Sequence, residues 1–188
     1  MSAPTVGILA LQGDFEAHAK MLESLGATPR FVRVPADLEQ LDALVLPGGE
    51  STTMTLGVER EGLAQPLRAF AATGAPILGT CAGMIMLDRA HLAILDIVAE
   101  RNAFGRQLHS FEADLEVGGL AGPPVHAVFI RAPLVREHGP GVQVLAAVDG
   151  DPVAVRQGEI VALSFHPELY GETRFHQQLL DQTGVERA

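Results

Sequence analysis

The chain has 188 residues, 47% of them hydrophobic, with a formal net charge of -10 and a sequence pI near 5.0. We therefore expect one globular domain, residues 1–188, with a sizeable core, and we exclude nucleic acid as the main partner of so acidic a chain. One cysteine, an N-terminus without a signal-peptide pattern and no apolar run near the roughly 20 residues of a membrane span predict a cytoplasmic protein that does not enter membranes.

The first half alternates apolar runs with helical patterns. Four runs predict strands that are covered on both faces: TVGILAL at 5–11, RFVRV at 30–34, ALVLP at 43–47 and PILGT at 76–80. A helix with Asp14 as N-cap and Gly26 as stop is predicted between the first two runs. Its buried face is expected to carry Ala17, Met21, Leu22 and Leu25. A second helix is predicted at 65–73. This alternation indicates an α/β fold with a parallel central sheet.

The second half is mostly strand-like. Its runs are separated by Gly/Pro turns and predict extra, partly antiparallel strands at 93–100, 110–117, 126–132, 142–148, 152–157 and 160–165. A last helix is predicted at about 172–182. The expected fold is therefore a single α/β domain with a mostly parallel sheet and added antiparallel strands in the second half.

The single cysteine lies in GTCAG, residues 79–83, between a predicted buried strand and a helical segment. Small residues around a central nucleophile are typical of the sharp strand-to-helix turn that presents a reactive side chain at the carboxyl edge of an α/β sheet. The helix start favours the thiolate, and the N–H of Ala82 is a candidate oxyanion donor. The alternative is that Cys81 is a buried small hydrophobe. The turn pattern favours a nucleophile.

A cysteine nucleophile needs a base, and His166 follows the predicted strand at 160–165, so it should emerge at the same sheet edge. Glu168 lies two residues further on and, in extended backbone, can point the same way and orient the imidazole. An ordinary turn at HPE is the alternative. The other histidines are interpreted as surface or capping residues: His18, His91, His109, His126, His138 and His176.

A glycine-rich turn, LPGGESTTM at 46–54, follows another predicted strand. Gly48 and Gly49 allow close approach of a ligand, and their N–H groups are expected to supply the second oxyanion donor. The same string also fits a turn before a helix capped at Ser51, and both interpretations can hold. Neither GxGxxG nor GxxxxGK[ST] is present, which argues against nucleotide binding.

Together these strings resemble the class I (triad) glutamine amidotransferases. GTCAG and HPE carry the general likeness. LALQGDFEAH, LPGGESTTM, ERNAFGRQ, SFEADL and FIRAP are similar to the glutaminase subunits of pyridoxal 5'-phosphate synthase, in the order in which that family has them. The likeness covers residues 5–169 and implies a flavodoxin-like three-layer fold.

The resemblance also implies the roles of individual residues. Cys81 would be the nucleophile, His166 the general acid/base and Glu168 the residue that orients it. The glutamine pocket would consist of Gly49, Glu50, Ser51, Arg101, Ile130 and Arg131. An arginine can hold the α-carboxylate of glutamine and Glu50 can meet its α-ammonium; the alternative for both arginines is a surface ion pair.

The expected reaction is hydrolysis of L-glutamine to glutamate and ammonia through a γ-glutamyl thioester. No CxxC or HExxH pattern occurs, so neither a metal nor a cofactor is expected. The chain offers no place for an ammonia acceptor. The family implies a separate (β/α)8-barrel synthase subunit in a large hetero-oligomer, which makes pyridoxal 5'-phosphate from ribose 5-phosphate and glyceraldehyde 3-phosphate.

The sequence departs from the family at two places, and three rival functions remain open. Ala103 stands where the family string RNSFGRQ has a serine, and the segment at 88–99 is short. The rivals are a glutaminase subunit of another synthase, such as that of histidine biosynthesis, a stand-alone cysteine peptidase or hydrolase, and a non-catalytic module on the same fold. GGESTTM and RNAFGRQ count against the first, and the intact Cys, His and Glu set counts against the last.

Overall fold

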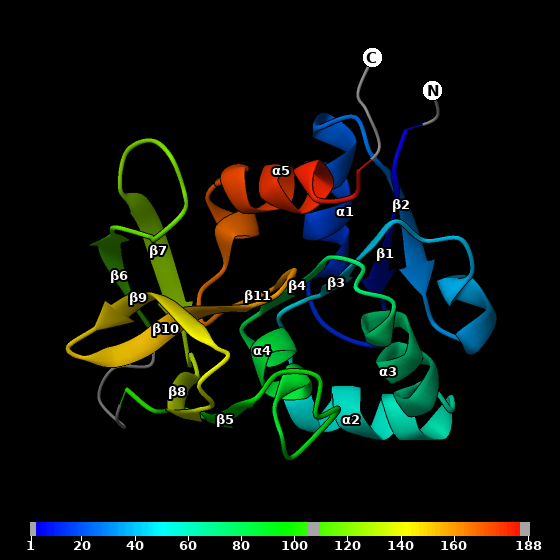
Figure 1. Cartoon of the computed structure of the whole chain (residues 1–188), viewed down its shortest axis with the longest axis horizontal. Helices are drawn as coiled ribbons and strands as arrows, with labels where there is room; N and C mark the ends of the chain where they lie inside the picture. Colours follow the sequence, from blue (N-terminus) through cyan, green and yellow to red (C-terminus); the bar gives the residue numbers. More distant parts are fainter. Residues whose placement is uncertain (1–2, 105–109, 185–188) are drawn as a thin grey trace.

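The apolar runs of the first half form the parallel part of a seven-stranded sheet (Figure 1). The computed structural model describes residues 3–104 and 110–184. The strand order is β2-β1-β3-β4-β11-β10-β9, with bounds Thr28–Val32, Thr5–Leu9, Ala43–Leu46, Ile77–Thr80, Ile160–Leu163, Asp151–Gln157 and Gln143–Val148. Neighbours from β2 to β11 pair in parallel, and β10 pairs antiparallel with β11 and β9. The predicted mixed α/β fold is confirmed.

Helices cover both faces of this sheet, which is why its central strands β1, β3, β4 and β11 are mostly apolar and buried. On one face lie α1 (Phe15–Ser24) and α5 (Arg174–Asp181), and on the other lie α2 (Ser51–Arg60), α3 (Ala64–Ala72) and α4 (Ala82–Leu87) (Figure 1). Successive strand residues alternate between the two cores: Val45 packs with the α1/α5 side, and Leu44 and Leu46 pack with the α2–α4 side. No helix in the described ranges is long and apolar enough to be a membrane span.

The predicted helices are present with small shifts. The two at 65–73 and 172–182 correspond to α3 and α5, and the first is α1. Met21 and Leu22 are buried as expected, but Ala17 and Leu25 are only partly buried, and His18 takes a core position instead. Gly26 has a φ of 82°, a conformation that suits glycine at a helix end. Asp14 occupies the N-cap position of α1 as predicted, but its side chain makes no capping hydrogen bond.

Two short antiparallel ribbons stand beside the main sheet. β5 (Ile97–Glu100) pairs with β8 (Leu134–His138), and β6 (Ser110–Leu115) pairs with β7 (Val125–Ile130). The strand predicted at 93–100 starts only at Ile97, because Asp88 accepts backbone hydrogen bonds that fold the preceding residues into a tight loop. β8 was not predicted, since its last three residues are exposed and polar and break the apolar pattern.

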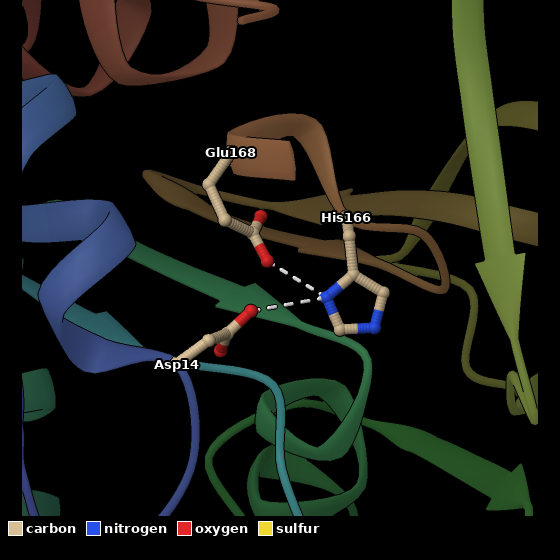
Figure 2. Close-up of side chains that lie close together, drawn as sticks. All are labelled: Asp14, His166 and Glu168. Carbon is tan, nitrogen blue, oxygen red and sulfur yellow. Dashed lines mark hydrogen bonds and ion pairs between the residues drawn. The ribbon is translucent and has the colours of Figure 1, made fainter. Parts of the chain in front are cut away.

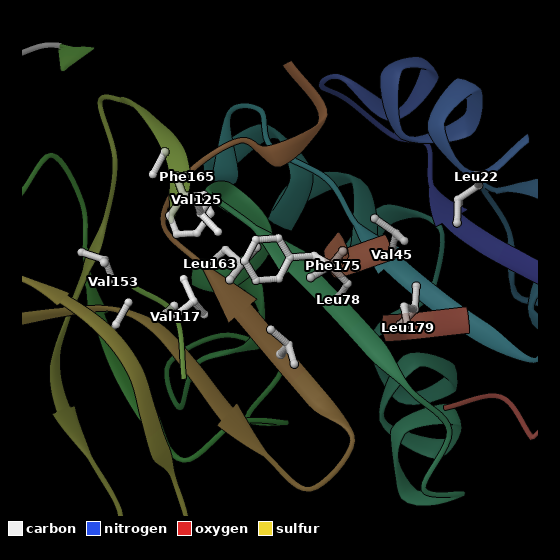
Figure 3. Packing of buried hydrophobic residues seen from close by; sticks show 14 of the residues in the cluster. Leu22, Val45, Leu78, Val117, Val125, Val153, Leu163, Phe165, Phe175 and Leu179 are labelled. Carbon is white, nitrogen blue, oxygen red and sulfur yellow. The ribbon is translucent and has the colours of Figure 1, made fainter. Parts of the chain in front are cut away.

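A line of aromatic rings joins the β6–β7 ribbon to the main domain. The rings of Phe111 and Phe129 stack with centroids 4.4 Å apart, and Phe129 meets Phe165 at 5.6 Å. Phe165 in turn contacts Phe175 of α5 at 5.7 Å (Figure 3). Because Phe165 precedes His166, and Phe129 precedes Ile130, this packing fixes two segments of the candidate site relative to each other.

Candidate functional site

The turn predicted around Cys81 is present between β4 and α4. Cys81 has φ 49° and ψ -107°, a strained conformation for a residue other than glycine, and its N–H donates to the Leu163 carbonyl at 2.7 Å. A Cβ at Gly83 would lie 2.0 Å from the Leu46 carbonyl oxygen, and one at Gly79 would lie 2.6 Å from Leu87 Cδ1. Both small residues are therefore required for α4 to pack closely on β3 and β4.

His166 and Glu168 approach each other as predicted, but by a different backbone route. Residues Pro167–Leu169 form a 3-10 turn, η2, rather than the extended backbone assumed from the sequence, because the fixed φ of Pro167 suits the first position of such a turn. Within this turn His166 Nδ1 donates to Glu168 Oε1 at 2.7 Å (Figure 2). The Glu168 side chain is fully buried, and that of His166 is 9% exposed.

A second carboxylate faces the same ring nitrogen. Asp14 Oδ2, at the start of α1, lies 3.3 Å from His166 Nδ1 (Figure 2). These two residues are 152 positions apart. Asp14 was predicted only as a helix N-cap, and a single sequence carries no signal that places its carboxylate against His166. The candidate base therefore has two acidic neighbours.

Behind Glu168 lies a buried pair of histidines that the sequence analysis placed wrongly at the surface or at caps. His18 and His176 are both fully buried, and His18 Nδ1 is 2.8 Å from His176 Nε2. The other nitrogen of His18 is 3.2 Å from Thr80 Oγ1 and 3.6 Å from Glu168 Oε2. Burial lowers the pKa of His18 to about 4 and that of His176 well below its usual range, so both are neutral.

The other histidines that the structure describes, His91, His126 and His138, form hydrogen bonds with groups outside this cluster. His91 is half-buried against Asp88, and His126 and His138 are exposed, as interpreted from the sequence. His109 lies outside the described residues, as do residues 105–107 of the ERNAFGRQ string.

His166, Asp14 and Glu168 shift one another's pKa values. Burial lowers the pKa of His166, but hydrogen bonds to Asp14, Cys81 and Glu168 outweigh burial and raise it to about 12. Burial opposes ionisation of Asp14, yet its hydrogen bonds to His166 and Glu168 hold its pKa below the usual range. Burial raises the pKa of Glu168, as does the neighbouring Asp14. The site thus favours an imidazolium beside Cys81.

Nearly all predicted site residues line one cavity of about 480 Å³, a volume suited to a small metabolite. The predicted residues in its wall are Gly48, Gly49, Glu50, Ser51, Cys81, Ala82, Arg101, Ile130, Arg131 and His166. Glu168 stands behind His166 instead. Residues that line the cavity without having been predicted are Gln12, Asp14, Ile85, Asn102 and Leu169.

The glycine turn owes its composition to contacts within the protein. A Cβ at Gly48 would lie 2.4 Å from His166 Cε1, and one at Gly49 would lie 2.3 Å from Gln12 Oε1. The Gly48 carbonyl accepts a hydrogen bond from the Asp14 N–H at 3.1 Å. Because a trans peptide opposes its N–H and C=O, the Gly49 N–H points away from Asp14.

Glu50, not Ser51, is the N-cap of α2. Its carboxylate accepts hydrogen bonds from the N–H groups of Thr52 at 3.0 Å and Thr53 at 2.8 Å. These bonds, together with that from the Thr53 hydroxyl, lower the pKa of Glu50 to about 2. The Glu50 carboxylate is thereby kept ionised and fixed at the edge of the cavity.

Two arginines complete the wall. Arg101 Nη1 donates to Thr52 Oγ1 at 2.9 Å, and Arg131, with φ 44°, follows Ile130, whose carbonyl oxygen is 3.9 Å from Cys81 Sγ. Neither guanidinium takes part in the arginine ion pairs found among the described residues. The ion-pair alternative is therefore wrong for the described contacts, and both cations are available to an anionic ligand.

Two further features of the structure resemble binding sites. A larger cavity of about 750 Å³ lies on the other side of Glu168, beside α1, but its wall contains neither Cys81 nor His166. The second feature is a group of three residues, Asp14, His166 and Glu168, whose possible metal-binding atoms lie within 4.8 Å of one another. Because Nδ1 donates to Glu168 at 2.7 Å, its proton occupies the direction from which a cation would approach. The smaller cavity is the one suited to chemistry.

Comparison with known proteins agrees with this geometry. A model of the SNO glutamine amidotransferase family matches residues 8–184. The chain is 53% identical over 190 residues to the pyridoxal 5'-phosphate synthase subunit PdxT of Frankia alni and 54% identical to that of Frankia casuarinae, with 96% of each chain covered in both cases. A crystal structure of a glutamine amidotransferase is similar with a TM-score of 0.89 and 46% identity, and the match covers 96% of this chain and 99% of that one.

Proposed function

The chain belongs to the SNO glutamine amidotransferase family, and from this premise we propose that it is the glutaminase subunit of a pyridoxal 5'-phosphate synthase, in vitamin B6 biosynthesis. It hydrolyses L-glutamine to L-glutamate and ammonia. The observation that carries the proposal is that the cavity of about 480 Å³ is lined by Cys81, by His166, by the turn at residues 48–51 and by Arg101 and Arg131, which make no ion pair within the described ranges. Such a cavity offers a nucleophile, a base and partners for both charged ends of glutamine.

Acylation uses the pair of Cys81 and His166. The thiolate of Cys81 attacks the γ-carboxamide carbon, and the oxyanion accepts hydrogen bonds from the N–H of Ala82 at the start of α4 and from the turn at Gly48–Gly49. The imidazolium of His166 then gives its proton to the departing nitrogen. Ammonia leaves, and a γ-glutamyl thioester and a neutral imidazole remain.

Deacylation restores the starting state. His166 takes a proton from water as the water attacks the thioester, and collapse of the second tetrahedral species releases glutamate and the thiolate of Cys81. In the thioester Cys81 carries no negative charge. One of the interactions that raise the pKa of His166 is then missing, which favours the neutral imidazole when a base is needed.

Substrate recognition is assigned to the rest of the cavity wall. Arg101 and Arg131 supply the cations for the α-carboxylate, and Glu50, fixed by its hydrogen bonds to α2, supplies an anion for the α-ammonium. Gly49, Ser51 and Ile130 shape the remainder. These roles follow from charge complementarity and from the family resemblance.

The oxyanion turn is a natural point of control. The hydrogen bond from Asp14 N–H to the Gly48 carbonyl holds the Gly48–Gly49 peptide in one orientation. We propose that the synthase subunit sets the orientation of this peptide, which would couple glutamine hydrolysis to the presence of the acceptor. Crystals of the free subunit in which this turn already completes an oxyanion hole would contradict the idea.

Ammonia is a nucleophile only while unprotonated, so a protected route to an acceptor is required. We propose that residues 1–188 act as one glutaminase domain in the cytoplasm and that a (β/α)8-barrel synthase subunit, in a large hetero-oligomer, receives the ammonia. The acceptor substrates would be ribose 5-phosphate and glyceraldehyde 3-phosphate. The reaction at Cys81 itself uses no metal or cofactor.

The test is glutamate release from glutamine by the protein alone and with an added pyridoxal 5'-phosphate synthase subunit. We expect strong stimulation by the partner and complete loss in Cys81→Ala. Iodoacetamide should alkylate Cys81, and glutamine should protect it. Equal activity with and without the partner would indicate a stand-alone amidase. Stimulation only by a different synthase would assign the chain to another pathway, and no activity with any of them would indicate a non-catalytic module.

A further inference from the structure

The arrangement at His166 contains one acidic group more than a triad needs. An imidazolium has a single proton on Nδ1, and Glu168 Oε1 accepts it at 2.7 Å. Asp14 Oδ2 nevertheless lies 3.3 Å from the same nitrogen (Figure 2). Glu168 alone fixes the tautomer and the ring orientation, so the presence of Asp14 calls for another explanation.

A purely local role for Asp14 does not account for its position. Asp14 stands at the start of α1, but its side chain caps no N–H group of that helix. The carboxylate is turned inward instead, with its side chain 25% exposed. Its second oxygen, Oδ1, is buried and has no hydrogen-bond partner among the described residues, as is the case for Glu168 Oε2. Such incomplete satisfaction is costly for a side chain that only supports the fold.

The two carboxyl groups and the imidazole form one electrostatic unit. Asp14 and Glu168 both approach Nδ1 and interact with each other. Two carboxyl groups this close share a proton at ordinary pH unless a neighbouring cation neutralises them and allows both to ionise. His18, behind Glu168, is neutral and does not supply that cation. His166 is therefore the group whose positive charge this pair stabilises.

We propose that Asp14 is a fourth, positioning residue of the glutaminase site: together with Glu168 it forms a carboxyl pair that keeps His166 an imidazolium beside the Cys81 thiolate into the alkaline range. This inference rests on the proposed glutaminase function for its kinetic consequence, but its electrostatic content stands on the geometry. Asp14 acts through His166 and does not form a bond with the substrate's reacting atoms.

The groups that face the imidazole decide the direction of the effect. They are Asp14 from the start of α1, Glu168 from η2 and Cys81 from the turn before α4, while His18 of α1 adds a weaker influence from behind. Asp14, Glu168 and the Cys81 thiolate favour the cation, and burial opposes it. Without the charge of Asp14, only one carboxyl group stabilises the imidazolium, while the effect of burial, which lowers the pKa of His166, is unchanged. The imidazolium must therefore lose its proton at lower pH.

The variant that tests this is Asp14→Asn, which keeps the size of the side chain and removes its charge. The control is Glu23→Gln, which removes one exposed carboxylate from the same helix, α1. The pH dependence of kcat/KM for glutamate release is measured with the synthase subunit present. We expect the alkaline limb of Asp14→Asn to move down by about one pH unit or more, and that of Glu23→Gln to coincide with the original protein.

A second measurement does not depend on activity. In the free, full-length chain labelled with ¹⁵N-histidine, the ring nitrogens of His166 report its protonation state directly, and His166→Gln assigns the signal. We expect an imidazolium that persists beyond pH 9 in the original protein and titrates at least about one unit lower in Asp14→Asn. Asp14→Glu, which restores the charge, should recover much of the difference.

The outcomes separate the two proposals. An active original protein whose pH profile is unchanged in Asp14→Asn would overturn the inference and leave the glutaminase function intact. Absence of glutaminase activity with the synthase would instead contradict the function, while the nitrogen titration would still decide the role of Asp14. If His166 in the original protein titrates near pH 6.5, the inference is wrong even if Asp14→Asn does not fold.

Discussion

The buried histidine pair makes a quantitative prediction about stability. His18 is fully buried and neutral, and its pKa falls from 6.5 to about 4 on folding. A base with a lowered folded-state pKa contributes stability that is complete above pH 6.5 and is lost as the pH falls toward 4, because the unfolded chain then binds the proton more readily. A glutamine side chain does not titrate. We therefore expect the unfolding free energy of His18→Gln to depend less steeply on pH than that of the original protein.

The size of the effect follows from the two pKa values. At pH 7 His18 is mostly neutral in both states. At pH 5 it is mostly protonated in the unfolded chain and mostly neutral in the folded one. The original protein should therefore lose about 2 kcal/mol more unfolding free energy than His18→Gln between pH 7 and pH 5. Asp14, His166, Glu168 and His176 also titrate but remain in both proteins, so the difference between the two pH profiles reports His18 together with its charge interactions with Asp14 and His176.

The assay is urea unfolding followed by far-ultraviolet circular dichroism at pH 5, 6 and 7, because the chain has no tryptophan and one tyrosine. His138→Gln is the matched control, since it makes the same replacement at an exposed position. The pH profile of its unfolding free energy should run parallel to that of the original protein. Parallel profiles for His18→Gln as well would refute the argument, because they would mean that folded His18 accepts protons as easily as the unfolded chain does.

Two further predictions concern the cavity and the core. Gly48→Ala would place a Cβ 2.4 Å from His166 Cε1 and displace the ring, so glutaminase kcat/KM should fall about 100-fold or more. Gly141→Ala, whose nearest neighbour would be 4.0 Å away, should leave that rate unchanged, and similar rates for the two variants would contradict the steric reasoning. Phe129→Ala removes a ring that is 1% exposed and stacks in the aromatic line, so it should cost about 3–5 kcal/mol in urea unfolding. A loss below about 1 kcal/mol would mean that the aromatic line does not hold the β6–β7 ribbon.

Much of the fold could be predicted because its signals are local. Apolar runs of four to five residues correspond to β1, β3 and β4, since strands covered on both faces must be apolar throughout. The turn at Cys81 could be predicted because its packing requires small residues, Gly79 and Gly83, at positions where there is no room for a Cβ. The strand β8 was missed for the complementary reason: its exposed end carries charged residues, and its pairing with β5 is visible only in three dimensions.

The nucleophile, its histidine and the glycine turn could be identified as candidates from the amino-acid sequence, because each follows a strand whose carboxyl end lies at one edge of a parallel sheet. The residues that surround them became known only from the folded chain. Asp14 meets His166 across 152 residues, and His18 meets His176 across 158. A polar residue on a helix looks the same in a sequence whether it faces solvent or a buried partner. The partner is decided by how α1, η2 and α5 pack together, so these long-range contacts appear only in the folded chain.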